Sequence, residues 1–312
     1  MTKKVGKGFG YGKVILFGEH FVVYGVPGIA SGIKKYVKVK VEEYKDGILF
    51  HDRIFNCDVY FDKSYEHPHC KTFAKILDYF EVKNAKITIT GDVIPMAGMG
   101  YSAALAVAVI RGLSKFTGKR ISNEEVNRLA YECEKISHTN PSGIDNTCAT
   151  YGKIIWFQKN MKGGKNIIEP IQINGKILLV MGYSGKMGST KELVEKVRMN
   201  KEREPKKYDE IFSKAENLVK EARKKLISFD LRELGKLMDE NHSLLRKIEV
   251  SCYELDKLCE IAKENGALGA KLTGSGGGGF MIALAENKNV QEKIMKAIEE
   301  NGYKAIKIEI GN

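Results

Sequence analysis

The chain has 312 residues, of which 43% are hydrophobic, so it has enough apolar material for packed cores in two domains or in one large domain. No apolar run approaches the length of a membrane span, and the start of the chain lacks the apolar segment of a secretory signal. We therefore expect a cytoplasmic protein with no membrane partner.

The net charge of +12 raises the question of a nucleic-acid partner. The lysines mix with glutamates at helical spacing, as in residues 191–196 and 216–225, and this pattern is typical of a solvated helix face. Because no basic block is interleaved with aromatic residues along the sequence, we expect no nucleic acid to bind. The charge instead suits anionic small molecules.

The six cysteines form no Cys-x-x-Cys pair, which is typical of small core residues in a reducing compartment. Cys57 and residues 67–70 (His-Pro-His-Cys) look like a zinc-binding cluster at first sight. Pro68 and the spacing of these side chains favour a surface turn instead.

The first half of the chain is predicted to alternate strands with helices. Residues 36–42 alternate strictly and place three valines on one face of a strand. Residues 45–47 (Lys-Asp-Gly) have the composition of a hairpin turn, and residues 122–125 (Ser-Asn-Glu-Glu) form a capping box. Strands are predicted at 9–17, within 18–25 after a turn, and at 36–42, 85–91 and 153–158; helices are predicted at 70–80, 105–113 and 122–137, and after a cap at Asn140 or Ser142.

The second half reads as a small α+β lobe with antiparallel strands. The composition changes near residues 161–165, where we place the crossing between two domains, 1–163 and 164–312. Beyond it we predict a buried strand at 177–182, three or four charged helices within 190–264, strands ending at 272 and covering 280–284, a helix at 290–301 and a strand at 305–310.

A glycine-containing loop joins the strand at 85–91 to the helix at 105–113. A helix N-terminus offers free N–H groups and a positive dipole end to a phosphate, and glycines let the phosphate approach the backbone. The alternative is an ordinary tight turn, because the loop is neither a Walker loop nor a G-x-G-x-x-G motif. The loop consists of Pro95, Met96, Ala97, Gly98, Met99, Gly100, Tyr101, Ser102, Ala103 and Ala104.

Residues 271–280 (Lys-Leu-Thr-Gly-Ser-Gly-Gly-Gly-Gly-Phe) are the second glycine-rich segment. A simple hairpin between two strands needs only two loop residues, and so many glycines are costly in regular structure. We favour a loop whose backbone approaches an anionic ligand closely over a flexible linker.

Four ionisable residues have two possible interpretations each. Lys13 and His20 lie at a strand end and in the turn after it, and they are ordinary exposed side chains unless other segments join them. Glu134 lies late in a helix with an inward apolar stripe, and Asp145 lies just after a helix start. They are either a solvated Glu and a capping Asp, or a magnesium ligand and a catalytic base.

Together, residues 12–30, 95–104, 140–145 and 271–280 resemble the motif set of the GHMP kinase superfamily of small-molecule kinases. Within it, Gly18-Glu-His-Phe-Val-Val-Tyr-Gly-Val-Pro-Gly-Ile-Ala30 and Asn140-Pro-Ser-Gly-Ile-Asp-Asn146 are similar to the mevalonate kinase branch. The resemblance implies a two-lobe α+β fold with a left-handed βαβ crossover. The N-terminal lobe, which binds the nucleotide, is implied to be ribosomal protein S5 domain 2-like, and the C-terminal lobe, which completes the cleft, to be ferredoxin-like.

The same resemblance implies a role for each matching position. Residues 95–104 would wrap the ATP phosphates, supported by Gly274, Ser275, Gly276 and Gly277. Ser102 and Glu134 would hold magnesium. Asp145 would accept the proton of the substrate alcohol, Lys13 would stabilise the developing oxyanion, and Glu19 and His20 would lie on the substrate. Arg198 lies in a segment similar to the mevalonate kinases, where it would bind the substrate carboxylate or be a surface arginine.

Tyr101 departs from the family, which usually has two serines where this chain has Tyr101-Ser102. A tyrosine is too large to replace a serine pressed against a phosphate. We therefore assign the metal contact to Ser102 and predict that the Tyr101 ring points away from the nucleotide.

The resemblance implies phosphorylation of the 5-hydroxyl of (R)-mevalonate by ATP in isoprenoid biosynthesis, with assembly as a homodimer left open. Two alternatives are another GHMP kinase, acting on phosphomevalonate or a sugar, and a non-catalytic nucleotide- or RNA-binding protein. Retention of Lys13, Glu134 and Asp145 together argues against the second, because binding alone needs no base.

Overall fold

The computed structural model describes residues 4–62, 66–95, 98–137 and 141–311. The chain divides into two compact units. Unit 1 comprises Met1–Lys13, Lys34–Pro95 and Met99–Gly152, and unit 2 comprises Val14–Ile33, Met96–Gly98 and Lys153–Asn312. The division follows spatial contact rather than chain order, and the expected boundary between 163 and 164 stays a prediction.

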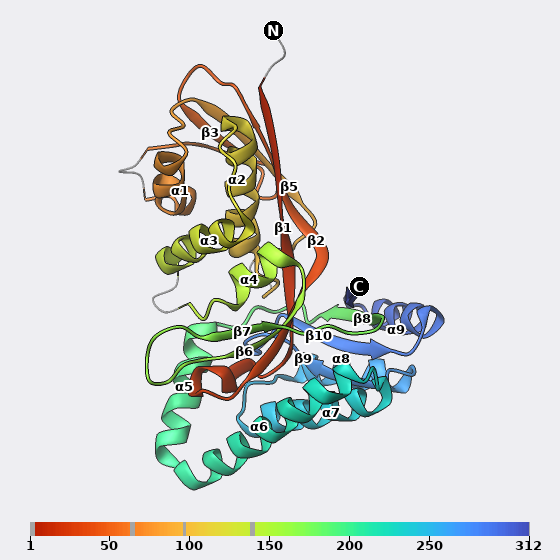
Figure 1. Ribbon diagram of the computed structural model, residues 1–312. Coiled ribbons are helices and arrows are strands. Elements are labelled where there is room, and N and C mark those ends of the chain that lie inside the picture. The colour runs from red at the N-terminus through yellow and green to blue at the C-terminus, as the bar shows by residue number, and fades with distance from the viewer. Residues whose placement is uncertain (1–3, 63–65, 96–97, 138–140, 312) are drawn as a thin grey trace. The chain divides into compact units, whose positions relative to one another are not determined.

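Unit 1 packs helices against one face of a mixed sheet (Figure 1). The strand order is β4-β3-β5-β2, with β3 parallel to β5 and the other pairs antiparallel. Val37, Val39 and Val41 are buried, as their alternation predicts. The elements are β1 (Val5–Phe17), β2 (Gly28–Glu42), β3 (Ile48–Asp52), β4 (Cys57–Tyr60), α1 (Pro68–Tyr79), β5 (Ala85–Gly91), α2 (Tyr101–Thr117), α3 (Asn123–Ser137) and α4 (Ile144–Tyr151).

Two local predictions in unit 1 are wrong. Residues 45–47 do not close a hairpin, because β5 lies between β2 and β3 and pairs with both. Residues 67–70 are not a surface turn: His67 caps α1, Pro68 is the first residue of that helix, and Cys70 is buried. Both errors arise because turn-forming residues are read locally, whereas strand pairing and burial depend on distant segments.

The Ser122 half of the predicted capping box is confirmed, since Ser122 Oγ accepts a hydrogen bond of 3.2 Å from Glu125 N, whereas the Glu125 carboxylate accepts from Arg128 at 2.7 and 2.8 Å. The cap of α4 differs from both expected residues: Gly143 occupies that position, and Ser142 Oγ accepts from Ile144 N at 3.3 Å. Asn140 lies outside the described residues.

Unit 2 contains the predicted antiparallel sheet, with strand order β11-β8-β10-β9 and four helices between β8 and β9. The first residues of β2, Gly28–Ser31, pair here with β6, which also pairs with β7. The elements are the 3-10 helix η1 (Glu19–Tyr24), β6 (Ile154–Gln158), β7 (Ile167–Pro170), β8 (Lys176–Tyr183), α5 (Thr190–Arg203), α6 (Pro205–Ile227), α7 (Leu231–Lys247), α8 (Tyr253–Glu264), β9 (Gly269–Leu272), β10 (Phe280–Ala285), α9 (Lys288–Glu300) and β11 (Lys304–Gly311).

The short strand predicted within residues 18–25 is wrong, because η1 occupies this segment. Gly18 and Gly25 bracket it in left-handed conformations, with φ of 101° and 87°. Phe21 and Val22 are buried, and the left-handed glycines at both ends turn the chain so that the six residues between them form a short helix. Among the described residues, no helix is both long and apolar enough to cross a membrane.

Candidate active site

The start of α2 meets Lys13 and Asp145 within unit 1. Gly100 caps the helix with φ of 71°. A Cβ atom on Gly100 would lie 2.7 Å from Cγ of Lys13 and 3.7 Å from Oδ2 of Asp145. Only glycine therefore lets the positive end of α2 come this close to the two side chains.

The other residues of the predicted phosphate loop differ in what they can offer. Met99 O accepts from Lys13 N at 2.8 Å, and Ala104 N already donates to Gly100 O at 3.0 Å. The N–H groups of Tyr101, Ser102 and Ala103, in the first turn of α2, have no acceptor within the helix. Pro95 has no N–H to offer, and Met96 and Ala97 lie outside the described residues.

Lys13 of β1 forms an ion pair with Asp145, which lies in the first turn of α4. Lys13 Nζ lies 3.2 Å from Asp145 Oδ1, and the two side chains are 9% and 33% exposed. Asp145 can therefore be reached by a small ligand, while Lys13 is held behind it. This geometry fits a carboxylate that exchanges a proton beside a fixed cation.

Glu134 of α3 is the third charged group here. Its residue is only 5% exposed. Burial and, to a smaller extent, the nearby charge of Asp145 raise the pKa of Glu134 to about 8, and the charge of Lys13 opposes both. Two carboxyl groups and one ammonium leave the cluster short of positive charge, which fits a divalent cation.

Such a cation would need oxygen ligands from outside the protein as well. In the described part of the chain, no group of three or more His, Cys, Asp and Glu side chains is arranged to hold a metal ion. Mg²⁺ commonly binds through one or two protein oxygens and completes its shell with waters and phosphates. Ser102 and Glu134 fit that limited role.

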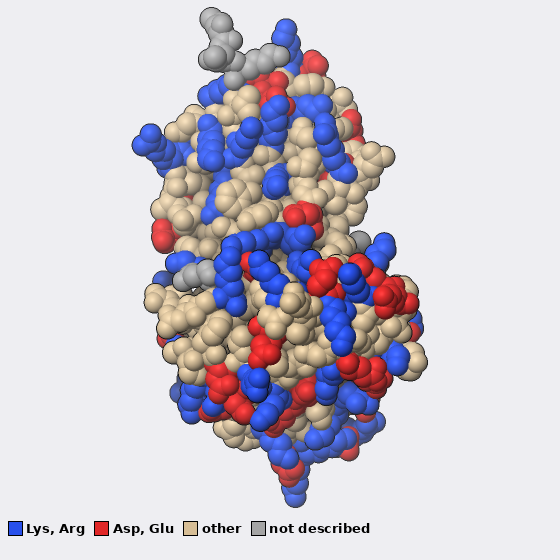
Figure 2. Space-filling view, turned by 90° about the vertical axis from the view of Figure 1, so that its right-hand side faces the viewer, with Lys and Arg blue, Asp and Glu red and all other residues tan. Residues whose placement is uncertain are grey.

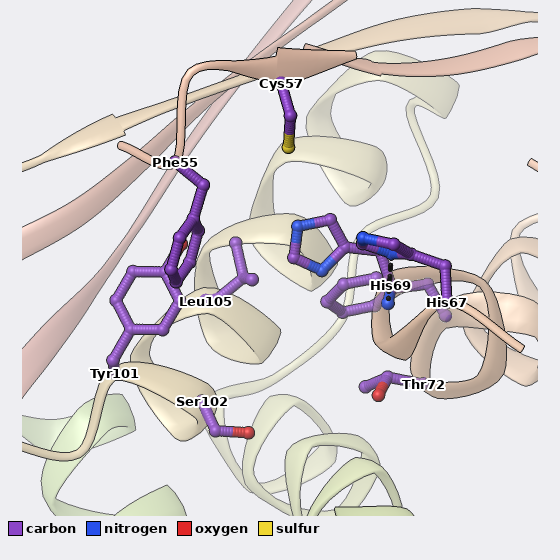
Figure 3. A pocket seen from close by; sticks show the side chains of 9 residues that line it. Phe55, Cys57, His67, His69, Thr72, Tyr101, Ser102 and Leu105 are labelled. Carbon is purple, nitrogen blue, oxygen red and sulfur yellow. Dashed lines mark hydrogen bonds between the residues drawn. The ribbon is translucent and has the colours of Figure 1, made fainter. Parts of the chain in front are cut away.

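A pocket of about 450 Å³ adjoins Tyr101 and Ser102 in unit 1. Figure 3 shows the rings of Phe55 and Tyr101 side by side at one end and the imidazoles of His67 and His69 at the other. Sequence reasoning missed this pocket, because its residues come from three distant segments. Its lining consists of Phe55, Cys57, His67, His69, Thr72, Phe73, Tyr101, Ser102 and Leu105.

Tyr101 belongs to the wall of this pocket. Its ring meets that of Phe55 edge to face, with centroids 5.7 Å apart, and its hydroxyl donates to Asp52 Oδ2 at 3.4 Å. Burial and the charge of Asp52 raise the pKa of Tyr101 well above its usual value. The ring is thus fixed by Asp52 and Phe55, and its position relative to a nucleotide stays a prediction.

Asp52 is fully buried, and both of its carboxylate oxygens have hydrogen-bond partners. Its Oδ2 lies 3.0 Å from His69 Nε2, and its Oδ1 accepts from Ile54 N and Phe55 N at 2.9 and 3.1 Å. Burial raises the pKa of Asp52, but these hydrogen bonds outweigh burial and leave it below its ordinary value. The carboxylate therefore organises the wall of the pocket.

In unit 2, Glu19 is completely enclosed with Lys271. The side chains are both 0% exposed and form an ion pair. Glu19 Oε2 also accepts from Asn241 Nδ2 at 2.9 Å, and Lys271 Nζ donates to Leu272 O at 2.7 Å. Burial lowers the pKa of Lys271, and the Glu19 charge opposes this shift. Both oxygens of Glu19 are occupied, so its predicted place on a substrate stays a prediction.

His20, the next residue, is 4% exposed and has one free ring nitrogen. Its Nε2 lies 2.7 Å from Ser275 O, a carbonyl that can only accept, so Nε2 carries the proton. Burial lowers the pKa of His20. Nδ1 is then a buried acceptor with no hydrogen-bond partner among the described residues, and it can receive a ligand hydroxyl.

The glycine-rich loop between β9 and β10 approaches protein backbone rather than open space. A Cβ atom on Gly276 would lie 1.9 Å from Val250 O, and Gly277 N donates to that oxygen at 2.9 Å. Nothing among the described residues lies within 4 Å of a Cβ atom on Gly274. The close approach expected here therefore serves internal packing at Gly276, and the space beside Gly274 is open for a ligand.

Arg198 lies exposed on α5 between two glutamates. Its Nε and Nη2 donate to Glu195 at 3.0 and 2.5 Å, and its Nη1 donates to Glu202 at 2.7 Å. These side chains raise the pKa of Arg198 further. Its role as a substrate cation stays a prediction, and a substrate carboxylate would have to compete with both glutamates.

Asn241 was missed from the sequence, although a signal existed. It follows Leu234 and Met238 on the buried stripe of α7, where an apolar residue is expected. A polar side chain in such a position needs a buried partner, and Glu19 supplies one.

Models of two families match the chain. The model of the GHMP kinases N terminal domain matches residues 68–153, and that of GHMP kinases C terminal matches residues 205–304. The mevalonate kinase of Thermococcus sibiricus is 36% identical, covering 93% of this chain and 91% of that protein. The mevalonate kinase of Pyrococcus furiosus is 37% identical, also covering 93% and 91%.

Solved structures agree with these relatives. The L. major mevalonate kinase in complex with R-mevalonate is 34% identical, with a TM-score of 0.90, and the match covers 99% of this chain and 97% of that one. The mevalonate kinase of Methanococcus jannaschii is 27% identical, with a TM-score of 0.84 and coverage of 100% and 99%. The predicted α+β GHMP kinase fold is confirmed. The chain belongs to the GHMP kinase superfamily and, within it, to the mevalonate kinase family.

Proposed function

We propose that this protein transfers the γ-phosphate of ATP to the 5-hydroxyl of (R)-mevalonate, giving (R)-5-phosphomevalonate and ADP. The observation that carries the proposal is the Lys13–Asp145 pair, 3.2 Å apart, at the N-terminus of α2. A phosphate on the first turn of α2 would lie beside a base and a cation, which are the groups that alcohol phosphorylation needs.

Each part of the transfer has a residue to carry it. Asp145 accepts the proton of the alcohol as its oxygen forms a bond to the γ-phosphorus. The bond between that phosphorus and the oxygen bridging to the β-phosphate breaks, and ADP leaves with its electrons. Lys13 lies where it stabilises negative charge on the attacking oxygen. The first-turn N–H groups of α2 hold the phosphates in line.

Ser102 and Glu134 are the residues that we propose for magnesium. The raised pKa of Glu134, to about 8, reflects a buried carboxyl without enough positive charge around it. A bound Mg²⁺ supplies charge neutralisation to the β- and γ-phosphates. The protein's part would be to hold the Glu134 carboxyl at that position, where the charge of a bound cation would favour its ionised form.

We assign the nucleobase of ATP to the pocket next to Ser102. Its volume of about 450 Å³ and its aromatic lining suit a planar ring. On this assignment the Tyr101 ring borders the base. The ring would then point away from the phosphates of the nucleotide but not from its base. The hydroxyl of Tyr101 is committed to Asp52, which keeps the ring against Phe55.

In unit 2 we propose separate partners for a substrate hydroxyl and for the substrate carboxylate. The unpaired Nδ1 of His20 is a buried acceptor for a substrate hydroxyl. Arg198 is proposed for the mevalonate carboxylate, in exchange for one of its two glutamate partners. Glu19 would support this side indirectly, because it is saturated by Lys271 and Asn241.

A substrate panel tests the proposal. ADP release by the purified protein with ATP and Mg²⁺ should require (R)-mevalonate and should be absent with phosphomevalonate, galactose or homoserine. Phosphorus NMR should identify the product as the 5-phosphate. Turnover with one of the other alcohols and none with mevalonate would replace this function by that of another GHMP kinase.

A further inference from the structure

Unit 1 has a second, larger concavity that the kinase proposal does not use. It is an open groove of about 680 Å³ formed by β1, β2, β5 and neighbouring residues. Lys7 and Phe9 of β1 line one side because the intervening Gly8 faces α2, where a Cβ atom would lie 2.1 Å from Ala108 O. Alternation along β1 thus presents a lysine and an exposed aromatic ring to the groove.

The floor of the groove follows from the pairing of β2 with β5. In that register Lys38 is opposite Thr90, and Lys40 is opposite Thr88. All four line the groove. Lys38 and Lys40 are two residues apart on one face, so they are about 7 Å apart along the strand. Two cations with two hydroxyls across from them form a regular row of donors for an extended anion.

The charge of this groove is one-sided. Its cations are Lys7, Lys38, Lys40, Arg53 and Lys115, and Glu42 is the acidic residue among the described residues that line it. Lys40 pairs with Glu42 at 2.7 Å. Across the described part of the chain, neither Lys7, Lys38, Arg53 nor Lys115 has an ion pair with an acidic side chain. Figure 2 shows Lys and Arg side chains gathered over the strands of this unit.

Aromatic rings lie among these cations. Phe9 and Tyr36 both line the groove, and their ring centroids are 5.4 Å apart in an edge-to-face arrangement. Phe9 is 39% exposed. Lys38 Nζ lies 5.6 Å from the centroid of the Tyr36 ring. A positively charged groove with accessible aromatic faces is the arrangement by which proteins bind single strands without sequence preference.

We propose that this groove binds single-stranded RNA, with phosphates on the lysine–threonine row and a base against Phe9. The expectation that no nucleic acid binds is based on the absence of a basic block interleaved with aromatic residues along the sequence, and the residues of this groove come from segments far apart in the chain. The fold interleaves the basic and aromatic side chains across strands instead of along one segment.

Single-stranded RNA fits the groove better than other anions do. A membrane surface would require apolar side chains that protrude beyond the lysines, whereas here the aromatic rings line a concave surface. A double helix hides the faces of its bases, so the ring of Phe9 would have no base to stack on. Because the groove is open at the surface, an RNA strand can continue beyond it.

Fluorescence anisotropy with a labelled oligouridylate of about 12 nucleotides tests the proposal, since such grooves cover up to about 16. The double variant Lys38→Gln/Lys40→Gln should weaken binding about tenfold or more at low salt. It should also lower the slope of log K against log salt by about 1.4, because each phosphate contact with a single strand contributes about 0.7. Phe9→Leu should weaken binding about fivefold with the slope unchanged.

The matched control is Lys293→Gln/Lys296→Gln on α9, which removes the same charge from exposed positions of unit 2. Circular dichroism and thermal unfolding should show that all variants are folded, and RNA affinity should stay unchanged in the control. Equal weakening in both double variants would overturn the proposal, as it would show diffuse attraction to the net charge. Preference for duplex RNA or for anionic phosphatidylserine vesicles over the oligouridylate would overturn it as well.

Discussion

Two lysine–carboxylate pairs in this protein have similar composition and opposite surroundings. The side chains of Lys271 and Glu19 in unit 2 are both 0% exposed; Glu19 also accepts a hydrogen bond from Asn241, and Lys271 donates one to Leu272 O. In unit 1, Asp145 is partly exposed beside the buried Lys13, and the buried carboxyl of Glu134 lies near them. The first pair is saturated within the protein, whereas the second has hydrogen-bonding and charge capacity left for a ligand.

This difference is the reason that we propose the Lys13–Asp145 pair for catalysis and the Lys271–Glu19 pair for structure. A buried ion pair whose two carboxylate oxygens both accept hydrogen bonds holds the surrounding structure in place but cannot exchange a proton without a large cost. A carboxylate that solvent reaches, beside a fixed ammonium, can accept a proton during a reaction. Substitutions at the two pairs should therefore separate activity from stability.

The largest effect is expected at Asp145. Asp145→Asn keeps the shape of the side chain but removes the base, so kcat should fall by about 10²–10⁴-fold. KM for ATP should change little, and so should the free energy of unfolding, because the side chain is partly exposed. Steady-state kinetics and denaturant unfolding measure both. Substantial turnover by this variant would show that another group takes the proton.

The opposite result is expected at the saturated pair. Lys271→Met leaves the Glu19 carboxylate buried without its cation, which should lower the free energy of unfolding by about 3–5 kcal/mol. Guanidinium unfolding measures this loss. The double variant Lys271→Met/Glu19→Gln removes both charges and should recover part of it. If Lys271→Met lowered the free energy of unfolding no more than the double variant does, the two residues would not act as a structural pair.

Glu134 should couple stability to pH in the free protein. Its pKa rises from 4.5 to about 8 on folding, so the folded state binds more protons between these values. Stability should therefore fall as pH rises through this window and level off above about pH 8. Glu134→Gln should flatten this part of the pH profile and reduce kcat. Denaturant unfolding across the window, with and without Mg²⁺ and ATP, measures the effect.

If Glu134 holds magnesium as proposed, Mg²⁺ with ATP should stabilise the native protein most at the alkaline end, where the carboxylate is ionised. The same additions should shift the glutamine variant much less. Equal stabilisation of both proteins would assign the metal to other ligands.

The smallest effect is expected at Tyr101, beside a third carboxylate that is saturated. Tyr101→Phe removes a single hydrogen bond of 3.4 Å to Asp52, so unfolding should change by about 0.5–1.5 kcal/mol. The ring stays against Phe55, and kcat should be nearly unchanged. Tyr101→Ser removes the ring as well and should raise KM for ATP. Loss of all turnover in Tyr101→Ser would contradict the assignment of the metal contact to Ser102.

The sequence by itself determined most elements and the family, because both depend on local patterns. Alternation identified the valine face of β2, the capping box identified the start of α3, and the spaced motifs identified Lys13, Glu134 and Asp145 as candidates. These features require only neighbouring residues, whose periodicity and capping chemistry are visible in the chain.

Only the tertiary structure decided what surrounds each of these residues. It placed β5 between β2 and β3, enclosed Glu19 with Lys271, and used Gly276 for packing against Val250. It also joined basic and aromatic residues of separate strands into one groove. The physical reason is that strand pairing, desolvation and charge neighbours depend on contacts between residues far apart in sequence, which no local pattern records.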